Sequence, residues 1–199
     1  MDFSQLQKEY SHCCKCSELC KSRSQVVFGS GNKEADVLFV GEAPGASEDK
    51  QGIPFCGMSG KILNELLNSV GLSREEIFIT NTVLCRPEGN RNPAKDEIEN
   101  CRERLDKLIE VMRPKVIVTI GNFATERIIG KTGIKSIHGQ LFDFKDENNG
   151  DIKVVPVVHP ASYLYSGRNP ELFEQMKNDF KIIAKVVNSK IKQKSLGGF

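Results

Sequence analysis

The chain has 199 residues, of which 39% are hydrophobic and 27% are charged. This length and composition predict one folded domain with a substantial core and exclude an intrinsically disordered chain. The formal net charge of +2 does not by itself indicate a nucleic-acid surface. No apolar run approaches the roughly 20 residues of a membrane-spanning helix, and the first residues lack the basic and apolar regions of a secretory signal.

Short apolar segments alternate with amphipathic segments along the chain. In chain order, the sequence predicts a helix at 2–12, a strand at 37–40, a glycine- and proline-rich loop at 41–57, a helix at 62–70, a strand from 77 toward 85, a helix at 93–112, a strand at 116–120, a helix at 123–129, a strand at 153–158 and a helix at 171–190. This alternation predicts an α/β fold, a three-layer α/β/α sandwich with a central, mainly parallel four-stranded sheet. We expect residues 1–199 to form a single domain with a basic C-terminal tail at about residues 190–199.

The seven cysteines are unevenly spaced. Cys13 and Cys16 form a C-x-x-C pair, and Cys85 and Cys101 follow with fifteen residues between them. An odd count without a secretory signal predicts a reducing, cytoplasmic environment, in which metal binding is more frequent than a disulfide framework. Four thiolates can hold a tetrahedral metal ion or a cubane cluster, although any single cysteine is also compatible with a place in the core.

Polar residues gather where the predicted strands end. Glu42 and Glu48 follow the first strand, and Asn81 and His159 lie at the ends of two later strands. Carboxyl ends of parallel strands share one edge of an open α/β sheet, which is where ligands bind. An amide and an imidazole can read a planar heterocycle, Phe55 can stack on it, and a glutamate can orient or deprotonate water. Each residue alone also has an ordinary structural explanation, but together they predict a site.

A nucleotide-binding fold is the alternative that this geometry leaves open, and its motifs are weak. Gly29-Ser30-Gly31 is the nearest segment to a dinucleotide fingerprint, but Glu34 occupies the third glycine position and the segment precedes the first long strand. The sequence contains no G-x-x-x-x-G-K-[ST] loop. The segment Gly57–Gly60, which opens a predicted helix, is only a weak phosphate signal.

The order of these motifs resembles a known family. The segment Gly41–Gly45, followed by Glu48-Asp49 and Pro54-Phe55, is similar to the first motif of the iron–sulfur uracil-DNA glycosylases, often called family 4. The resemblance continues in order over about residues 13–185, through Thr80-Asn81, Cys85-Arg86-Pro87, Gly89–Pro93 and His159-Pro160-Ala161. It implies an enzyme of base excision repair that flips uracil out of DNA and hydrolyses its glycosidic bond, leaving an abasic site.

The resemblance also implies a [4Fe–4S] cluster that ties the N-terminal cysteine pair to the body of the domain. The implied ligands are Cys13, Cys16, Cys85 and Cys101. Zinc would accept the same four ligands, so the cysteines alone do not choose between the two. The remaining thiols are Cys14, Cys20 and Cys56.

The resemblance assigns uracil contacts to four residues. It implies that uracil stacks on Phe55 and bonds to backbone near Ala43, that Asn81 reads the N3–H and O4 edge, and that His159 donates to O2 as uracil leaves as an anion. With Asn81 fixed in one orientation, cytosine presents an acceptor where uracil has a donor, which explains its rejection. Glu48 is the favoured ligand of the catalytic water, and Glu42 is the second candidate.

Contacts to DNA, single or double stranded, are implied outside the pocket. Tyr163 or Leu164 is expected to fill the space that the flipped base leaves. Three basic side chains are expected to contact DNA phosphates, namely Arg168, Arg86 and Arg91. We expect a monomer, because a glycosylase acts on one lesion at a time. We also expect a monofunctional enzyme, because the family pattern marks no residue of this sequence as a Schiff-base lysine. Two alternatives remain: an iron–sulfur nucleic-acid-binding module without catalysis, and a zinc-stapled hydrolase of free nucleosides.

Overall fold

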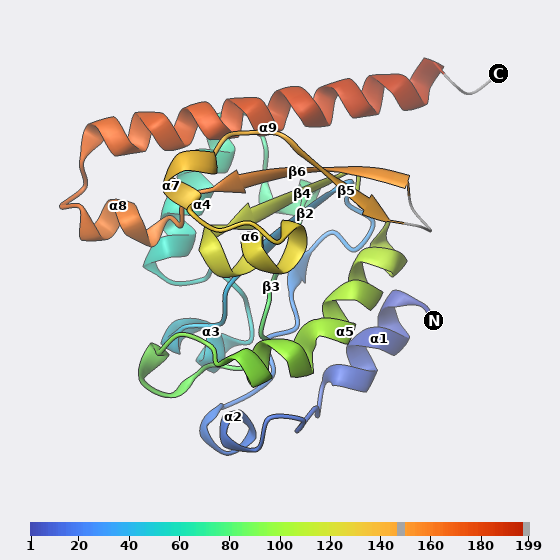
Figure 1. Cartoon of the computed structure of the whole chain (residues 1–199), viewed down its shortest axis with the longest axis vertical. Helices are drawn as coiled ribbons and strands as arrows, with labels where there is room; N and C mark the ends of the chain where they lie inside the picture. The colour runs from blue at the N-terminus through green and yellow to red at the C-terminus, as the bar shows by residue number, and fades with distance from the viewer. Residues whose placement is uncertain (147–149, 197–199) are drawn as a thin grey trace.

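The computed structural model of the chain contains a six-stranded mixed sheet between two layers of helices (Figure 1). It describes residues 1–146 and 150–196, and the side chains of residues 1–145 and 150–189. The strands are β1 (Ser30–Gly31), β2 (Val37–Gly41), β3 (Phe78–Asn81), β4 (Val116–Ile120), β5 (Phe142–Asp146) and β6 (Gly150–Val157). The helices are α1 (Phe3–Tyr10), α2 (Ser17–Ser22), α3 (Ala46–Gln51), α4 (Met58–Asn68), α5 (Lys95–Met112), α6 (Gly121–Ile129), α7 (Ile134–Ile137), α8 (Ala161–Tyr165) and α9 (Pro170–Leu196), with 3-10 turns η1 (Arg74–Glu76) and η2 (Glu88–Asn90).

The strand order is β1-β3-β2-β4-β6-β5. The neighbours from β3 to β6 pair in parallel, and β1 and β5 are antiparallel edge strands. The predicted α/β fold and its four parallel strands are therefore confirmed, but the predicted strand count was too low. In β5 the side chains of Phe142 and Phe144 are half-buried and alternate with exposed Asp143 and Lys145, as in a strand with one solvated face.

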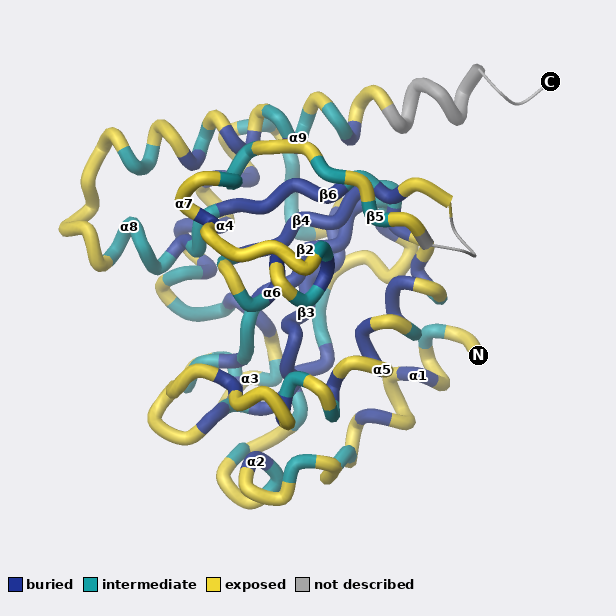
Figure 2. Tube along the Cα trace, in the orientation of Figure 1, coloured by how far each residue is buried: buried dark blue, intermediate teal, exposed yellow. Residues whose placement is uncertain are grey.

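Alternation along β2 divides the core between the two faces of the sheet. Leu38 and Val40 belong to an apolar cluster with side chains of α1, α5 and α6. Val37 and Phe39 belong to a second cluster with side chains of α4 and α9. Strands β2, β3 and β4 are buried along their length, and β6 is buried from Val154 to Val157 (Figure 2), which is why these segments are predominantly apolar in sequence. The three-layer arrangement follows from burying both faces.

Several element boundaries differ from those that the sequence predicts. The predicted loop at 41–57 contains α3, and the strand predicted from residue 77 ends at Asn81. Helix α5 begins at Lys95 rather than directly after Asn92-Pro93, because the Glu97 carboxylate accepts the Ala94 N–H at 2.7 Å and so caps the helix there.

The C-terminal helix is longer than predicted. The backbone of α9 is helical to Leu196, so most of the tail predicted at about residues 190–199 continues this helix. Residues 197–199, and the lysine side chains beyond Ser189, lie outside the described residues. Of the described helices, none is both long enough and apolar enough to cross a membrane.

The packing of α9 against the sheet generates a prediction about stability. Phe180 is 1% exposed, and its ring lies 6.1 Å from the ring of Phe39. Phe180→Ala removes this contact and leaves a cavity, so we expect the free energy of unfolding in urea to fall by about 3–5 kcal/mol. Leu141→Ala is the control, because Leu141 is 48% exposed. Equal, small losses in both variants would contradict this assignment of the core.

Candidate active site at the carboxyl edge of the sheet

The polar residues predicted to converge lie at the carboxyl ends of the parallel strands. Asn81 is the last residue of β3, and His159 follows β6 by two residues. Phe55 comes from the loop between α3 and α4, and its ring centroid lies 5.8 Å from that of His159, with 30° between the planes. The parallel register of β2 with β3 places Gly41 beside Asn81. The sheet edge therefore brings an aromatic ring, an imidazole and an amide into one place.

Gly41 makes this convergence possible. A Cβ atom at this position would lie 2.4 Å from Asn81 Oδ1 and 2.8 Å from Cε2 and Cζ of Phe55. Both distances are far below van der Waals contact, so any side chain here would displace the two residues. Asn81 and Phe55 therefore occupy the space directly above the Gly41 backbone.

The main-chain oxygen of Asn81 accepts a hydrogen bond, whereas its side-chain amide oxygen accepts none from the described residues. The side chain is 1% exposed, and Oδ1 accepts no hydrogen bond from the described residues. The fully buried Arg104 guanidinium donates to the main-chain oxygens of Asn81 and Thr82. Thr82 in turn donates to the Gly41 carbonyl from its N–H at 2.8 Å. A buried acceptor without a donor costs about 1–3 kcal/mol, which a ligand with an N–H group would recover.

His159 is a neutral hydrogen-bond donor. The Ala161 N–H donates to His159 Nδ1 at 3.1 Å, so the ring hydrogen of the neutral imidazole is on Nε2. Burial lowers the pKa of His159 to about 4, and the nearby Glu48 carboxylate opposes this shift only in part. The ring is therefore uncharged at neutral pH and offers one N–H.

The two candidate glutamates differ in how firmly they are held. Glu48 lies on α3, and its Oε1 accepts the Gly57 N–H at 2.9 Å. A Cβ atom on Gly45 would come within 2.8 Å of Glu48 Oε2, so the carboxylate is enclosed between two glycine segments. Glu42 is half-buried, and its carboxylate accepts no hydrogen bond within the described part of the chain; burial raises the pKa of this carboxylate. Ala43 is half-buried in the turn beside it.

The predicted wedge residues are not the most exposed ones. Tyr163 packs its ring 4.9 Å from that of Phe173, and Leu164 also packs against the cluster formed with α4 and α9. Tyr165, one residue later, is 89% exposed, and Arg168 is exposed as well. The exposure of Tyr165 cannot be predicted from the sequence, because the phase of the short helix α8 cannot be read from five residues.

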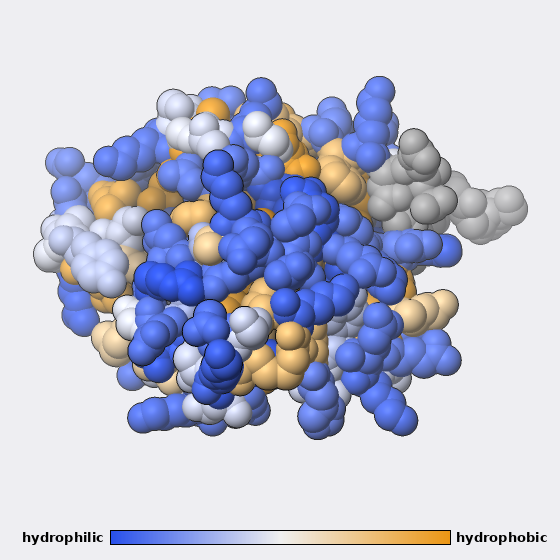
Figure 3. Space-filling view, turned by 60° about the horizontal axis from the view of Figure 1, so that its bottom comes forward, coloured by the Kyte–Doolittle hydropathy of each residue, from blue (hydrophilic) through white to orange (hydrophobic). Residues whose placement is uncertain are grey.

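Two of the three arginines predicted to contact phosphates have side-chain partners within the protein. Arg91 forms a bidentate pair with the buried carboxylate of Glu97, at 2.6 and 2.9 Å. Arg86 donates from Nε to Asn90 Oδ1 at 2.7 Å. The lower end of the molecule in Figure 1, where α2 and α3 lie, is mostly hydrophilic in Figure 3. Only Arg86 of the two lacks a carboxylate partner among the described residues.

The four predicted ligand cysteines share one part of the core. They lie in or against the apolar cluster that includes α1 and α5, and they are Cys13, Cys16, Cys85 and Cys101. Two side chains donate to these sulfurs: Arg23 Nη1 to Cys85 at 2.8 Å, and Asn100 Nδ2 to Cys16 at 3.4 Å. Burial raises the pKa of the Cys85 thiol to about 11. Across residues 1–145 and 150–189, no three His, Cys, Asp or Glu side chains are close enough to hold a metal ion.

One cysteine assignment is wrong. Cys14 and Cys20 are not the spare thiols expected from the sequence, because a disulfide joins Cys14, before α2, to Cys20 within α2. The start of this short helix brings them together, because the Cys20 N–H bonds to the Cys16 carbonyl at 2.8 Å and so turns the chain back. The odd cysteine count could not reveal this pair. Cys56 is a half-buried free thiol.

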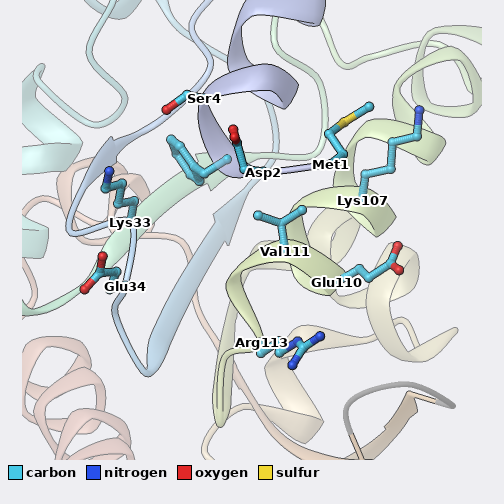
Figure 4. Close-up of a pocket in the computed structure, with 10 residues that line it drawn as sticks. Met1, Asp2, Ser4, Lys33, Glu34, Lys107, Glu110, Val111 and Arg113 are labelled. Carbon is cyan, nitrogen blue, oxygen red and sulfur yellow. The ribbon is translucent and has the colours of Figure 1, made fainter.

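A cavity of about 760 Å³ lies elsewhere (Figure 4). It is lined by the first residues of the chain, by Lys33 and Glu34, and by Lys107 and Arg113 at the end of α5. Lys33 and Glu34 precede β2, and Arg113 precedes β4, so the cavity opens at the amino-terminal edge of the sheet. It is therefore separate from the site described above.

Comparison with known proteins agrees with this arrangement. Residues 28–181 match the uracil DNA glycosylase superfamily. A type-4 uracil-DNA glycosylase of Archaeoglobus fulgidus is 40% identical over 188 residues, covering 92% of each chain. Proteins of the same name from Sulfurisphaera tokodaii and Thermotoga maritima are 41% and 40% identical, over 92% and 80% of this chain and 84% and 81% of their own. The chain belongs to the uracil DNA glycosylase superfamily and, within it, to the type-4 uracil-DNA glycosylases.

Proposed function

We propose that this protein is a monofunctional, monomeric uracil-DNA glycosylase that acts on DNA inside the cell. It hydrolyses the bond between N1 of uracil and C1′ of deoxyribose and leaves an abasic site. The observation that carries this proposal is the buried, unpartnered Oδ1 of Asn81 beside Phe55 and a neutral His159. Family membership supports the same reaction.

The pocket suits a flipped uracil ring. A base inside a duplex is inaccessible, so it must leave the stack at a cost of a few kcal/mol. Stacking on the Phe55 ring returns about 1–3 kcal/mol of that cost. Backbone groups of the turn at Ala43 are proposed to bond to uracil. Gly41 leaves room above its own backbone only for Asn81 and Phe55.

Asn81 discriminates uracil from cytosine. Its Oδ1 accepts N3–H of uracil, and its amide group donates to O4. Cytosine reverses both groups, and it would leave Oδ1 buried without a donor. Two mismatches of about 1–3 kcal/mol each correspond to roughly 10²–10⁴ in discrimination.

His159 and Glu48 act on opposite sides of the breaking bond. The electron pair of the bond moves onto uracil, and the Nε2–H of His159 stabilises the negative charge at O2. A neutral imidazole is suited to this role because its N–H donates a hydrogen bond without transferring the proton. Positive charge develops on the sugar as uracil leaves as an anion. Glu48, held by the Gly57 amide, orients the water that adds to C1′ and takes the proton that this water loses. Glu42 remains the second candidate for the water.

DNA contacts extend from the same edge. Tyr165 is the best candidate to fill the space left by the flipped base, because its ring is exposed whereas those of Tyr163 and Phe173 pack together. Arg168 and Arg86 are candidates for phosphate contacts. Arg91 is a weaker candidate because Glu97 already neutralises it.

A [4Fe–4S] cluster on Cys13, Cys16, Cys85 and Cys101 would brace the N-terminal segment against α5. The chemistry of the residues present suits such a group, because the four thiols lie in or against one core cluster and Arg23 and Asn100 donate to two of the sulfurs. The described cysteine side chains would have to move closer together to bind it. Bound there, the cluster would cross-link distant parts of the chain and take no part in the hydrolysis. Anchoring is already assisted by Ser24, whose N–H bonds to the Asp49 carboxylate.

The proposed reaction is tested with a labelled oligonucleotide that contains one deoxyuridine. After incubation and hot alkali, we expect cleavage only at uracil, with none in matched cytosine and thymine oligonucleotides. Borohydride is expected to trap no covalent adduct. Absence of cleavage by folded, cluster-loaded protein would refute the proposal.

Asn81→Asp tests the proposed hydrogen bonds between the Asn81 amide and the N3–H and O4 of uracil. The carboxylate retains an acceptor but loses the donor to O4, and it places a negative charge beside a base that leaves as an anion. We expect single-turnover excision to slow by about 10²-fold or more. Asn188→Asp, on the exposed side of α9, is the matched control. Unchanged activity in Asn81→Asp would remove this residue from the site.

The protonation state of His159 generates a pH prediction. Since burial lowers the pKa of His159 to about 4, the ring stays neutral as the pH falls from 8 to about 5 and gains its proton only near pH 4. Nitrogen-15 spectra of labelled histidine, assigned with His159→Gln, should show the Nε2–H tautomer throughout that range. A protonation midpoint near 6.5 would contradict the buried, neutral donor.

The proposed cluster is tested by visible absorption spectroscopy and by measuring the iron and sulfide content of the protein. Anaerobically purified protein should absorb broadly near about 400 nm and contain iron and sulfide, and Cys101→Ala should lose this absorbance. Cys56→Ala is the matched control, because Cys56 is outside the proposed ligand set. Stoichiometric zinc without the absorbance would overturn the cluster and leave the glycosylase proposal intact.

A further inference from the structure

The backbone of Phe55 adopts an unfavourable conformation. Its φ angle is +51°, in the left-handed region that bulky side chains rarely occupy. The side chain is nonetheless buried, with 7% exposed, and its ring contacts Gly41 and faces His159. Such a conformation persists only where neighbouring groups impose it.

Arg74 contacts this part of the backbone directly. From the turn η1, its guanidinium donates to the carbonyl oxygens of Pro54 at 3.1 Å and Phe55 at 2.6 Å. Its Nε donates to Asn64 Oδ1 at 2.7 Å, which fixes the plane of the fork. Arg74 is half-buried and forms no ion pair with a described carboxylate. Both terminal nitrogens of the guanidinium therefore donate to the loop that carries Phe55.

Helix α4 closes on the same carbonyl. A Cβ atom on Gly60 would lie 1.7 Å from the Phe55 oxygen, so only glycine allows the helix to approach this closely. The Phe55 carbonyl is thus in contact with both Gly60 and the Arg74 guanidinium. Rotation of the peptide toward an ordinary conformation would break the Arg74 hydrogen bond.

We propose that Arg74 is a positioning residue for catalysis, which fixes the Phe55 backbone so that its ring presents a flat face to the flipped base. The inference rests on the proposed stacking of uracil on Phe55. None of the described hydrogen bonds of Arg74 goes to Asn81, Glu48 or His159, so we expect its effect on catalysis to pass mainly through Phe55.

A double-mutant cycle separates this role from general stabilisation of the fold. Arg74→Gln and Arg74→Lys are made in the wild-type and Phe55→Ala backgrounds, and single-turnover excision and inhibition by free uracil are measured. In the wild-type background we expect a rate loss of about tenfold or more and weaker uracil inhibition, the scale of losing a charge-assisted hydrogen bond. In the Phe55→Ala background the same changes should cost less than about twofold. Arg102→Ala, a change of an exposed arginine on α5, should be neutral in both.

Equal losses in the two backgrounds would overturn the inference and leave a structural role only. Thermal unfolding of each variant verifies that the compared proteins are folded, and Arg74→Lys provides a milder change if Arg74→Gln is unstable. A crystal structure of the variant tests the geometry independently of activity: Phe55 should leave the left-handed region. An unmoved Phe55 would refute the inference even if the wild-type protein failed to excise uracil, a failure that would by itself refute the proposed function.

Discussion

The site depends on a close approach of three chain segments at Gly41. Strand β2 ends there without a side chain, and the Asn81 amide and the Phe55 ring occupy the space that a Cβ atom would need. Parallel pairing of β2 with β3 sets Asn81 beside Gly41, and the loop after α3 brings Phe55 over it. The recognition of the base, its stacking and the nearby imidazole all depend on this contact between backbone and side chains.

Two arginines stabilise the backbone segments that bring Asn81 and Phe55 together at Gly41. Arg104 donates to the main-chain oxygens at the end of β3, and Arg74 donates to those of the Phe55 loop. Burial lowers the pKa of both guanidinium groups, to about 10 for Arg104. A core built only for stability would favour apolar residues at such positions. The arrangement is consistent with a protein that spends stability on the geometry of its site.

The sequence predicts the parts of this structure that depend on local patterns. Continuous apolar runs identify the four parallel strands, and residues at their ends identify Asn81 and His159. It does not predict the capping by Glu97, which moves the start of α5, or the disulfide of Cys14 and Cys20. It also misses Tyr165, Arg74 and Arg104, because their exposure or contacts depend on helix phase and on segments distant in the chain.

The most direct test of the account is the role of the unpartnered Asn81 Oδ1 as acceptor for uracil N3–H. Single-turnover excision is measured on oligonucleotides that contain either deoxyuridine or N3-methyldeoxyuridine, with wild-type protein and Asn81→Ala. The account predicts rapid excision of uracil, a loss of about 10²-fold or more for the methylated base, and a much smaller difference between the two bases in Asn81→Ala. Equal excision of both bases by the wild-type protein would contradict it.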